Sequence, residues 1–303
     1  MLRGERYVGS LQALKSRLER QLLYASHRLQ SLAYLGAGTS TDLLEARVLS
    51  DLEYEGVAVT SIDELFGDAA ARIRESFSVA AGLTRLSSQA AGGAWTRRES
   101  STDLRPDVLL TRVPALYLLG LDSRLLSLVH RYLRLPVAYH GAVVRCSKVD
   151  GSGVGTRLWH QDAEDFHVFR VLVYMNDVTA GGGPFEYIPR SCAPRYKDFS
   201  QGTYVLTNEQ MSQVVPPERW KRVHGPAGTV VIADTAQVFH HESLQTDRER
   251  IVTMIGYSSR RPRELKLAMT HFPAESLAGV LKRVVPPAMH AHVFDWRRAA
   301  TQS

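Results

Sequence analysis

Cysteine and long apolar runs are both scarce in this chain of 303 residues. The two cysteines, Cys146 and Cys192, stand far apart without a CxxC pair, which argues against a disulfide framework and favours inert core thiols. No stretch reaches the roughly 18 consecutive apolar residues of a membrane span. The start of the chain is polar and charged, without the apolar core of a signal peptide. We therefore expect a soluble, cytoplasmic protein without a membrane partner.

Lysine is also rare, since it accounts for only six of the 37 basic residues. The net charge of +6 raises the question of a nucleic-acid partner. However, the arginines are spread along the chain, and no basic run is interleaved with aromatic residues. We expect no nucleic-acid partner. An acidic substrate or an acidic carrier protein stays open.

The first half of the sequence favours helices. The chain is 44% hydrophobic and 22% charged, which is enough apolar material for a globular core. Ser61 and Glu64 have the spacing of a capping box at a helix start. A stretch rich in Ser, Gly, Ala and Arg lacks periodicity and predicts a loop, with a lid as one role. The expected elements are a helix over 8–35 packed on the main domain, an extended piece over 56–60, a helix to Ser78, the loop over 85–107 and a helix over 122–135.

The second half is rich in β-forming residues separated by Gly, Pro, Asp and Ser. This pattern predicts a mainly β fold with helical additions: a double-stranded β-helix core, of the jelly-roll or cupin-like type, with N-terminal helices packed on one sheet. We expect a single domain with a helical layer over 1–135, the core over 137–260 and a C-terminal helix and tail over 261–303. The expected strands are 137–148, 169–175, 202–206, 229–233 and 251–257, with a closing helix over 274–284.

The chain is organised around Trp159-His160-Gln161-Asp162. On an extended strand His160 and Asp162 point to the same face, because strand side chains alternate with period 2. Both could then reach one metal ion. One further histidine from a distant strand would complete a two-histidine, one-carboxylate face, the ligand set typical of non-haem iron oxygenases. A single His-x-Asp triplet is weak evidence, so the rest of the sequence must supply the third ligand.

A second stretch offers that histidine. The strand from Ala227 ends near Thr235 and leads to His240 and His241. Neighbours on an extended chain face opposite ways, so only one of the two can coordinate. On the next strand Arg250, or Arg248 with the same parity, could hold a carboxylate with a charge-assisted fork. The spacing favours Arg250.

Two segments together resemble a known family. They are WHQDAEDFHVFRVLVYMNDVTAGGGPFEYIPRS, residues 159–191, and AGTVVIADTAQVFH followed by Arg250. They are similar to the phytanoyl-CoA dioxygenase-like family of Fe(II)/2-oxoglutarate-dependent oxygenases, and the resemblance covers about residues 137–260. The chain departs from the family pattern in two places. It has Arg190-Ser191-Cys192 where relatives often have Gly-Ser-His, and Glu242 where they commonly have glycine.

The resemblance implies roles for individual residues. His160, Asp162 and His240 would bind the metal, and Arg250 would bind the 2-oxoglutarate carboxylate. We add three cofactor-binding candidates: Arg170, Arg145 and Thr235. Arg170 could contact cosubstrate or substrate or be solvated, with even support for each reading. Arg145 and Tyr139 alternate on one strand face that could line the barrel, although ordinary structural roles are favoured for both. No catalytic residue is expected beyond the metal centre.

The resemblance also implies an activity. The cofactors would be Fe(II), 2-oxoglutarate and O₂, and the cosubstrate would be oxidatively decarboxylated to succinate and CO₂. Asp162 is present where related halogenases carry Gly or Ala. The expected reaction is therefore hydroxylation, or a related desaturation, epoxidation or ring closure, of a small molecule. Other readings stay open: a jelly-roll binding protein without chemistry, a nucleic-acid oxygenase and a zinc hydrolase.

Three features carry less weight. The arginines at 97, 98 and 105 suggest an anionic group on the substrate, but a solvated loop explains them as well. His290-Ala-His292 has metal-like spacing without a third partner, and we discount it. The glycine-rich segment 150–156 lacks the GK[ST] ending of a phosphate loop and is expected to border the mouth of the site.

Overall fold

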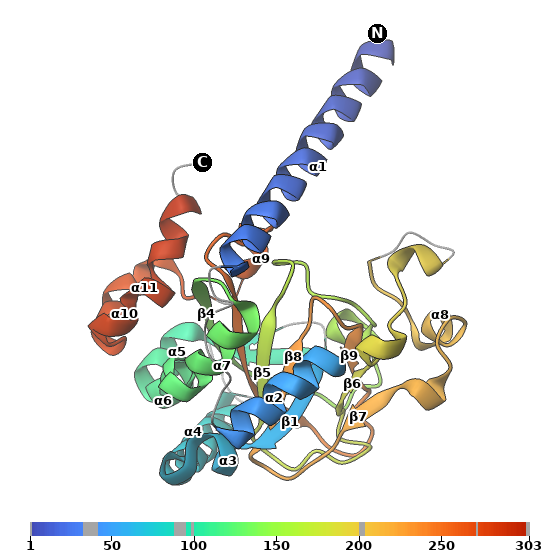
Figure 1. Ribbon diagram of the computed structural model, residues 1–303. Helices are drawn as coiled ribbons and strands as arrows, with labels where there is room; N and C mark the ends of the chain where they lie inside the picture. The colour runs from blue at the N-terminus through green and yellow to red at the C-terminus, as the bar shows by residue number, and fades with distance from the viewer. Residues whose placement is uncertain are drawn as a thin grey trace.

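Two antiparallel sheets form the body of the protein, as the computed structural model in Figure 1 shows. The structure describes residues 2–32, 42–87, 95–97, 100–199, 204–270 and 272–300. The larger sheet has the strand order β1-β8-β5-β10-β4-β3-β2, and the smaller has the order β7-β6-β9. The strands are β1 (Val57–Ser61), β2 (Trp95–Arg97), β3 (Ser101–Leu104), β4 (Val137–Ser147), β5 (Phe169–Tyr174), β6 (Phe185–Tyr187), β7 (Lys221–Val223), β8 (Thr229–Asp234), β9 (His240–Glu242) and β10 (Arg250–Ser259).

Helices cover one face of the larger sheet, and α2, α5, α6 and α7 contact its strands. More residues lie in helices than in strands, but the core is the predicted jelly roll. The α-helices are α1 (Leu2–Leu32), α2 (Leu43–Tyr54), α3 (Ile62–Phe66), α4 (Ala70–Ser87), α5 (Pro106–Arg112), α6 (Pro114–Leu118), α7 (Ser123–Leu133), α8 (Asn208–Ser212), α9 (Leu265–Ala268), α10 (Ala278–Val284) and α11 (His290–Val293). None of the helices in the described part of the chain has the length and apolar character that crossing a bilayer requires.

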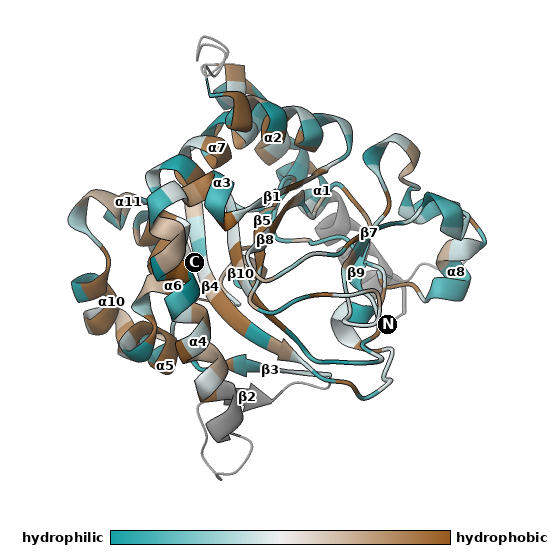
Figure 2. Ribbon diagram, turned by 90° about the horizontal axis from the view of Figure 1, so that it is seen from below, coloured by the Kyte–Doolittle hydropathy of each residue, from teal (hydrophilic) through white to brown (hydrophobic). Residues whose placement is uncertain are grey.

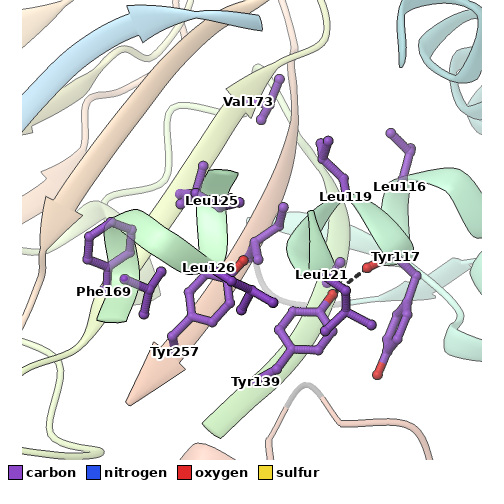
Figure 3. Packing of buried hydrophobic residues seen from close by; sticks show 14 of the residues in the cluster. Leu116, Tyr117, Leu119, Leu121, Leu125, Leu126, Tyr139, Phe169, Val173 and Tyr257 are labelled. Carbon is purple, nitrogen blue, oxygen red and sulfur yellow. Dashed lines mark hydrogen bonds between the residues drawn. The ribbon is translucent and has the colours of Figure 1, made fainter. Parts of the chain in front are cut away.

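The covered face of the large sheet holds the main hydrophobic core (Figures 2 and 3). Tyr139 of β4 and Tyr257 of β10 are fully buried there. Each places its hydroxyl group on a backbone carbonyl of the helical layer: Tyr139 on Tyr117 and Tyr257 on Gly120, both at 2.6 Å. A buried tyrosine hydroxyl group without such a partner would cost free energy, so these bonds fix how the helices sit on the sheet.

A bulge in β4 corrects one prediction. Gly141 pairs with Gly256 and Tyr139 pairs with Tyr257, so His140 has no partner on β10. An extra residue in one strand reverses which side chains face which side beyond it. Tyr139 therefore packs among the helices, while Arg145 faces the opposite side of the sheet. The expectation that the two share one face was wrong because period 2 does not continue through a bulge.

Several predicted elements are present, with changes at their ends. The strands expected in 137–148, 169–175, 229–233 and 251–257 are β4, β5, β8 and β10. The helix expected over 122–135 is α7, with Asp122 as its N-cap. The closing helix begins with a 3₁₀ turn and continues as α10. In the capping box, Ser61 Oγ accepts from the backbone N–H of Glu64 at 3.2 Å, but the Glu64 carboxylate accepts from the Thr60 hydroxyl group instead.

Two further expectations differ from the structure. The stretch 85–107 is not a plain loop, because it holds the end of α4 and strands β2 and β3; its residues 88–94 and 98–99 lie outside the described part. The strand expected over 202–206 reduces to one bridge at Leu206, and residues 202 and 203 are not described.

Helix α1 extends away from the body (Figure 1). The rings of Tyr24 and His27 contact Phe166, while Leu18 and Leu22 are exposed. The packing predicted for the N-terminal helix is thus observed near its C-terminal end.

Candidate metal centre

The small sheet brings together residues that are far apart in the sequence. His160 and His240 form an antiparallel bridge in which each backbone N–H donates to the other residue's carbonyl at 3.0 Å. The backbone N–H of Asp162 then donates to the Thr235 carbonyl at 2.9 Å. One possible ligand atom from each of His160, Asp162 and His240 lies within 4.8 Å of the others. The three side chains favoured by the sequence therefore converge on one point.

Backbone carbonyls fix the tautomers of both histidines. Nδ1 of His160 lies 2.7 Å from the Leu158 carbonyl, and Nδ1 of His240 lies 3.2 Å from the Val238 carbonyl. A carbonyl oxygen can only accept, so each Nδ1 must carry the hydrogen. Each Nε2 is left with a free lone pair. This arrangement, in which the second ring nitrogen is held by an acceptor, is characteristic of histidines that bind metals.

The carboxylate of Asp162 is oriented in the same manner. Its Oδ2 accepts from the Thr235 hydroxyl group at 2.7 Å and from Arg170 Nε at 3.0 Å. Its Oδ1 lies 3.8 Å from His160 Nε2. One oxygen is therefore held by the protein, while the other faces the histidines. Two imidazole nitrogens and one carboxylate oxygen fit an Fe(II) ion and leave coordination positions for other molecules.

Charges around the site keep the ligands in their metal-binding forms. Burial, with the neighbouring His160, lowers the pKa of His240 to about 3, so its ring is neutral near pH 7. Burial alone would raise the pKa of the Asp162 carboxyl. Arg170 and the two histidines outweigh that effect and lower it, so Asp162 is ionised. Neutral imidazole and ionised carboxylate are the forms that coordinate a metal.

The structure separates His240 from His241 as the sequence favoured. The His241 ring points away from the three ligand atoms and stacks on Trp159, with ring centroids 4.0 Å apart. Its Nε2 lies 2.8 Å from Glu186 Oε2, and its Nδ1 lies 3.0 Å from the Arg157 carbonyl. Both of its nitrogens are thus engaged elsewhere.

Arg170 orients Asp162 in this structure. Besides its bond to Asp162, it donates a short hydrogen bond to Glu164. A Cβ atom at Gly256 would come within 2.3 Å of Arg170 Nη1, so only glycine leaves room for the guanidinium there. The sequence pointed to Arg170 but not to Glu164 or Gly256. Glu164 lies two residues beyond Asp162. A second carboxylate at this spacing from a predicted ligand is the sequence feature that could have identified it.

An open cavity contains the three ligands and continues along the strands of the large sheet. Its walls include both apolar and charged side chains. The sequence did not identify the apolar residues that line it, because hydrophobic residues on strands are equally expected in an ordinary hydrophobic core. The residues that line it include Leu172, Phe185, Met254, Arg145, Arg170, Arg250 and Glu242.

Arg250 lies in this cavity, while its alternative Arg248 is exposed. The Arg250 guanidinium donates to the Gly183 carbonyl at 2.9 Å and to Glu242 Oε2 at 2.5 Å. Arg145 reaches the same cavity, but two hydrogen bonds of 2.7 and 3.0 Å hold it to Asp103. Thr235 also lines the cavity, and its hydroxyl group donates to Asp162 Oδ2.

The remaining sequence candidates lie apart from this centre. His290 and His292 contact the backbone carbonyls of Val285 and Val137. Arg105 pairs with Asp107 at the start of α5, while Arg98 and the side chain of Arg97 lie outside the described part. Cys146 is buried and free, as expected, and Cys192 is half-buried and free.

The glycine-rich segment 150–156 does border the cavity, because Thr156 lines it. The segment is tied down by Arg157, whose guanidinium group bonds to Asp150 and to the carbonyl of Ser152.

Solved structures share this fold at low sequence identity. EctD from S. alaskensis with bound Fe is 17% identical, with a TM-score of 0.51, over 75% of this chain and 82% of that one. The epimerase SnoN in complex with Fe³⁺, alpha ketoglutarate and nogalamycin RO is 16% identical, with a TM-score of 0.51, over 77% and 92%. EctD with 2-oxoglutarate and 5-hydroxyectoine is 16% identical, with a TM-score of 0.50, over 78% and 84%. At these identities the likeness establishes the jelly-roll fold.

No protein-family model matches the chain, and a search of curated proteins finds no match either. The similar structures therefore support the fold of this protein, and the arrangement of its own side chains supports the chemistry.

Proposed function

We propose that this protein is an Fe(II)- and 2-oxoglutarate-dependent oxygenase, a single domain that oxidises a C–H bond of a small molecule. The observation that carries the proposal is the convergence of three possible ligand atoms, Nε2 of each histidine and Oδ1 of Asp162. In each of these side chains the other polar atom, Nδ1 or Oδ2, is already hydrogen-bonded to the protein. The similar folds with bound Fe and 2-oxoglutarate agree with it.

Each residue has a defined task in this proposal. His160, Asp162 and His240 bind the metal on one face, and Thr235 and Arg170 hold the carboxylate in register. Arg250 supplies the positive charge for the distal carboxylate of 2-oxoglutarate. Leu172, Phe185 and Met254 exclude water along the cavity. When bound, iron with 2-oxoglutarate and O₂ supplies the oxidising power, and the protein supplies orientation.

The reaction is a hydroxylation or a related oxidation rather than a halogenation, because Asp162 would supply a carboxylate ligand where related halogenases carry Gly or Ala. Hydroxylation is the simplest outcome. A small molecule is the proposed substrate, since the similar structures are complexes with small molecules, nogalamycin RO in SnoN and 5-hydroxyectoine in EctD.

Succinate formation tests the proposal directly. Purified protein with Fe(II), 2-oxoglutarate and O₂ should release succinate slowly even without substrate, and more quickly when a substrate is found. The Asp162→Ala variant should lose this turnover. Undiminished succinate release in that variant would refute the assignment of the metal site.

One observation favours a second candidate, a jelly-roll protein that binds metal but not 2-oxoglutarate. Arg250, the proposed anchor of the cosubstrate, is already paired with Glu242. Under this candidate Fe(II) binds, but 2-oxoglutarate does not change the spectrum of the iron-loaded protein. Absorption spectra recorded without O₂ distinguish the two.

A further inference from the structure

Glu242 and Arg250 form a buried ion pair beside the metal site. Their side chains are only 5% and 3% exposed, and Oε2 of Glu242 lies 2.5 Å from Nη2 of Arg250. The other oxygen of Glu242 accepts a short hydrogen bond from Gln245. The carboxylate is thus held firmly against the guanidinium, in a low-dielectric setting where such a pair interacts strongly.

This ion pair lies on the wall of the cavity that contains the metal ligands. Glu242 and Arg250 both line that cavity, together with Leu172, Phe185 and Met254. The Nε–H of Arg250 is buried and has no hydrogen-bond partner. A buried guanidinium with an unused donor is a place where a further acceptor gains binding energy.

The other two arginines of the cavity offer no better place for a carboxylate. Arg145 is held by Asp103 through two hydrogen bonds, and Arg170 is held by Asp162 and Glu164. Releasing Arg170 would also release the ligand Asp162. A dicarboxylate that enters this cavity would therefore have to bind Arg250 while the Glu242 carboxylate is already paired with it.

We infer that Glu242 is a specificity-determining residue whose carboxylate competes with the distal carboxylate of the cosubstrate for Arg250. The inference rests on the proposed function. Two carboxylates bound to one buried guanidinium repel each other, so a dicarboxylate can bind Arg250 only if Glu242 moves away or if the repulsion weakens binding. A 2-oxo acid without a distal carboxylate bears no such cost. The unmodified protein thus has little preference for 2-oxoglutarate over such an acid.

A second guanidinium is placed to receive Glu242 when it moves. Arg157 Nε lies 3.8 Å from Oε1 of Glu242 and is itself a buried donor without a hydrogen-bond partner. Arg157 is fixed by Asp150 and by the carbonyl of Lys148. A small rotation of Glu242 toward Arg157 would free Arg250 while keeping the Glu242 charge paired.

The test measures dissociation constants of Fe(II)-loaded protein without O₂ for two ligands, 2-oxoglutarate and 2-oxopentanoate. The second has the same chain length but lacks the distal carboxylate. Glu242→Gln removes the competing charge and keeps a similar shape. We expect this variant to bind 2-oxoglutarate about tenfold more tightly than the unmodified protein, with binding of 2-oxopentanoate unchanged. Glu249→Gln, at an exposed glutamate next to Arg250, is the matched control and should change neither constant.

The possible failures are distinguishable. Equal affinity for 2-oxoglutarate in the unmodified protein and Glu242→Gln overturns the inference and leaves the proposed function intact. Iron binding without binding of either oxo acid, in every variant, overturns the proposed function and the inference with it. If Glu242→Gln does not fold, Glu242→Asp replaces it: the shorter side chain withdraws the carboxylate from Arg250 and should also tighten binding of 2-oxoglutarate selectively. Unchanged selectivity in Glu242→Asp would likewise overturn the inference.

Discussion

The two faces of the large sheet use the same strands for opposite purposes. Along β10, Ile251, Ile255 and Tyr257 belong to the apolar core under the helices, whereas Arg250, Met254 and Gly256 line the cavity. Figure 3 shows Tyr257 in this core. On the first face nearly every side chain is hydrophobic. On the second, arginines and carboxylates are buried as pairs. Burial without charge serves stability, while paired burial holds charged groups in fixed positions for binding.

Mutations on the two faces should therefore have different consequences, one for binding and the other for stability. A change to a side chain that lines the cavity should alter metal or cosubstrate binding at a smaller cost in stability, whereas Val231 and Val252 on the same face belong to a second buried apolar cluster. A change on the helical face should do the reverse. Four predictions follow this division, in decreasing order of effect.

Removal of a proposed ligand should have the largest effect. His160→Ala should weaken Fe(II) binding by at least about 100-fold, because one of three ligands is lost and the remaining two cannot enclose the ion. His290→Ala removes a histidine far from the centre and should leave the Fe(II) dissociation constant unchanged. Metal-binding calorimetry under nitrogen gives both values. Comparable iron affinity in the two variants would contradict the assignment.

A truncation on the helical face should mainly cost stability. Ile255 is fully buried, and Ile255→Ala should lower the free energy of unfolding by about 2–5 kcal/mol through lost contacts and a cavity. Its neighbour Met254 faces the open cavity, so Met254→Ala should cost about 1 kcal/mol or less. Urea denaturation followed by circular dichroism measures both. Equal losses would show that the two faces do not differ as described.

Removing a group that positions a ligand should have an intermediate effect. Thr235→Val keeps the shape of the side chain but removes the hydrogen bond to Asp162 Oδ2, and should weaken Fe(II) binding by about 10–100-fold. Thr229→Val is the control, because Thr229 begins β8, which Thr235 follows, and its hydroxyl group donates to the Pro226 carbonyl and not to a proposed ligand. An Fe(II) affinity in Thr235→Val equal to that of the control would mean that the hydroxyl group does not orient the carboxylate.

The smallest effect concerns pH and lies outside both faces. Burial opposes protonation of His167, but its hydrogen bond to the Asp234 carboxylate raises its pKa above 6.5. The protonated ring therefore stabilises the fold fully below about pH 6.5, and this contribution is lost as pH rises through the raised pKa. The side chain is 45% exposed, so the change in unfolding free energy should be less than about 1 kcal/mol. His167→Gln should remove this pH dependence in urea titrations between pH 6 and 9.

Much of this arrangement could be predicted from local patterns. Alternation and β propensity located four strands of the core, and the spacing in Trp159–Asp162 placed two ligands on one face. Strand parity showed that only one of His240 and His241 could coordinate, and the match to the family motif favoured His240. These features depend on residues close together in the sequence, where period 2 holds.

The rest depends on contacts between distant residues. The bulge at His140 appears only when β4 is aligned with β10, so the sequence could not show that Tyr139 and Arg145 separate. The sequence of β3 has no alternating pattern, and only its pairing with β4 in the structure identifies it as a strand. The pairing of Arg145 with Asp103, and of Arg250 with Glu242, joins segments whose approach no local pattern fixes.

The most direct test of the central claim is a titration of metal-free protein, without O₂, with Fe(II) and then 2-oxoglutarate. The visible absorption band of the iron-bound cosubstrate is followed. The account predicts that the band appears in the unmodified protein and in His241→Gln, which keeps a hydrogen-bond donor for Glu186, but not in His240→Ala. Absence of the band in well-folded unmodified protein, or its persistence in His240→Ala, would contradict the account.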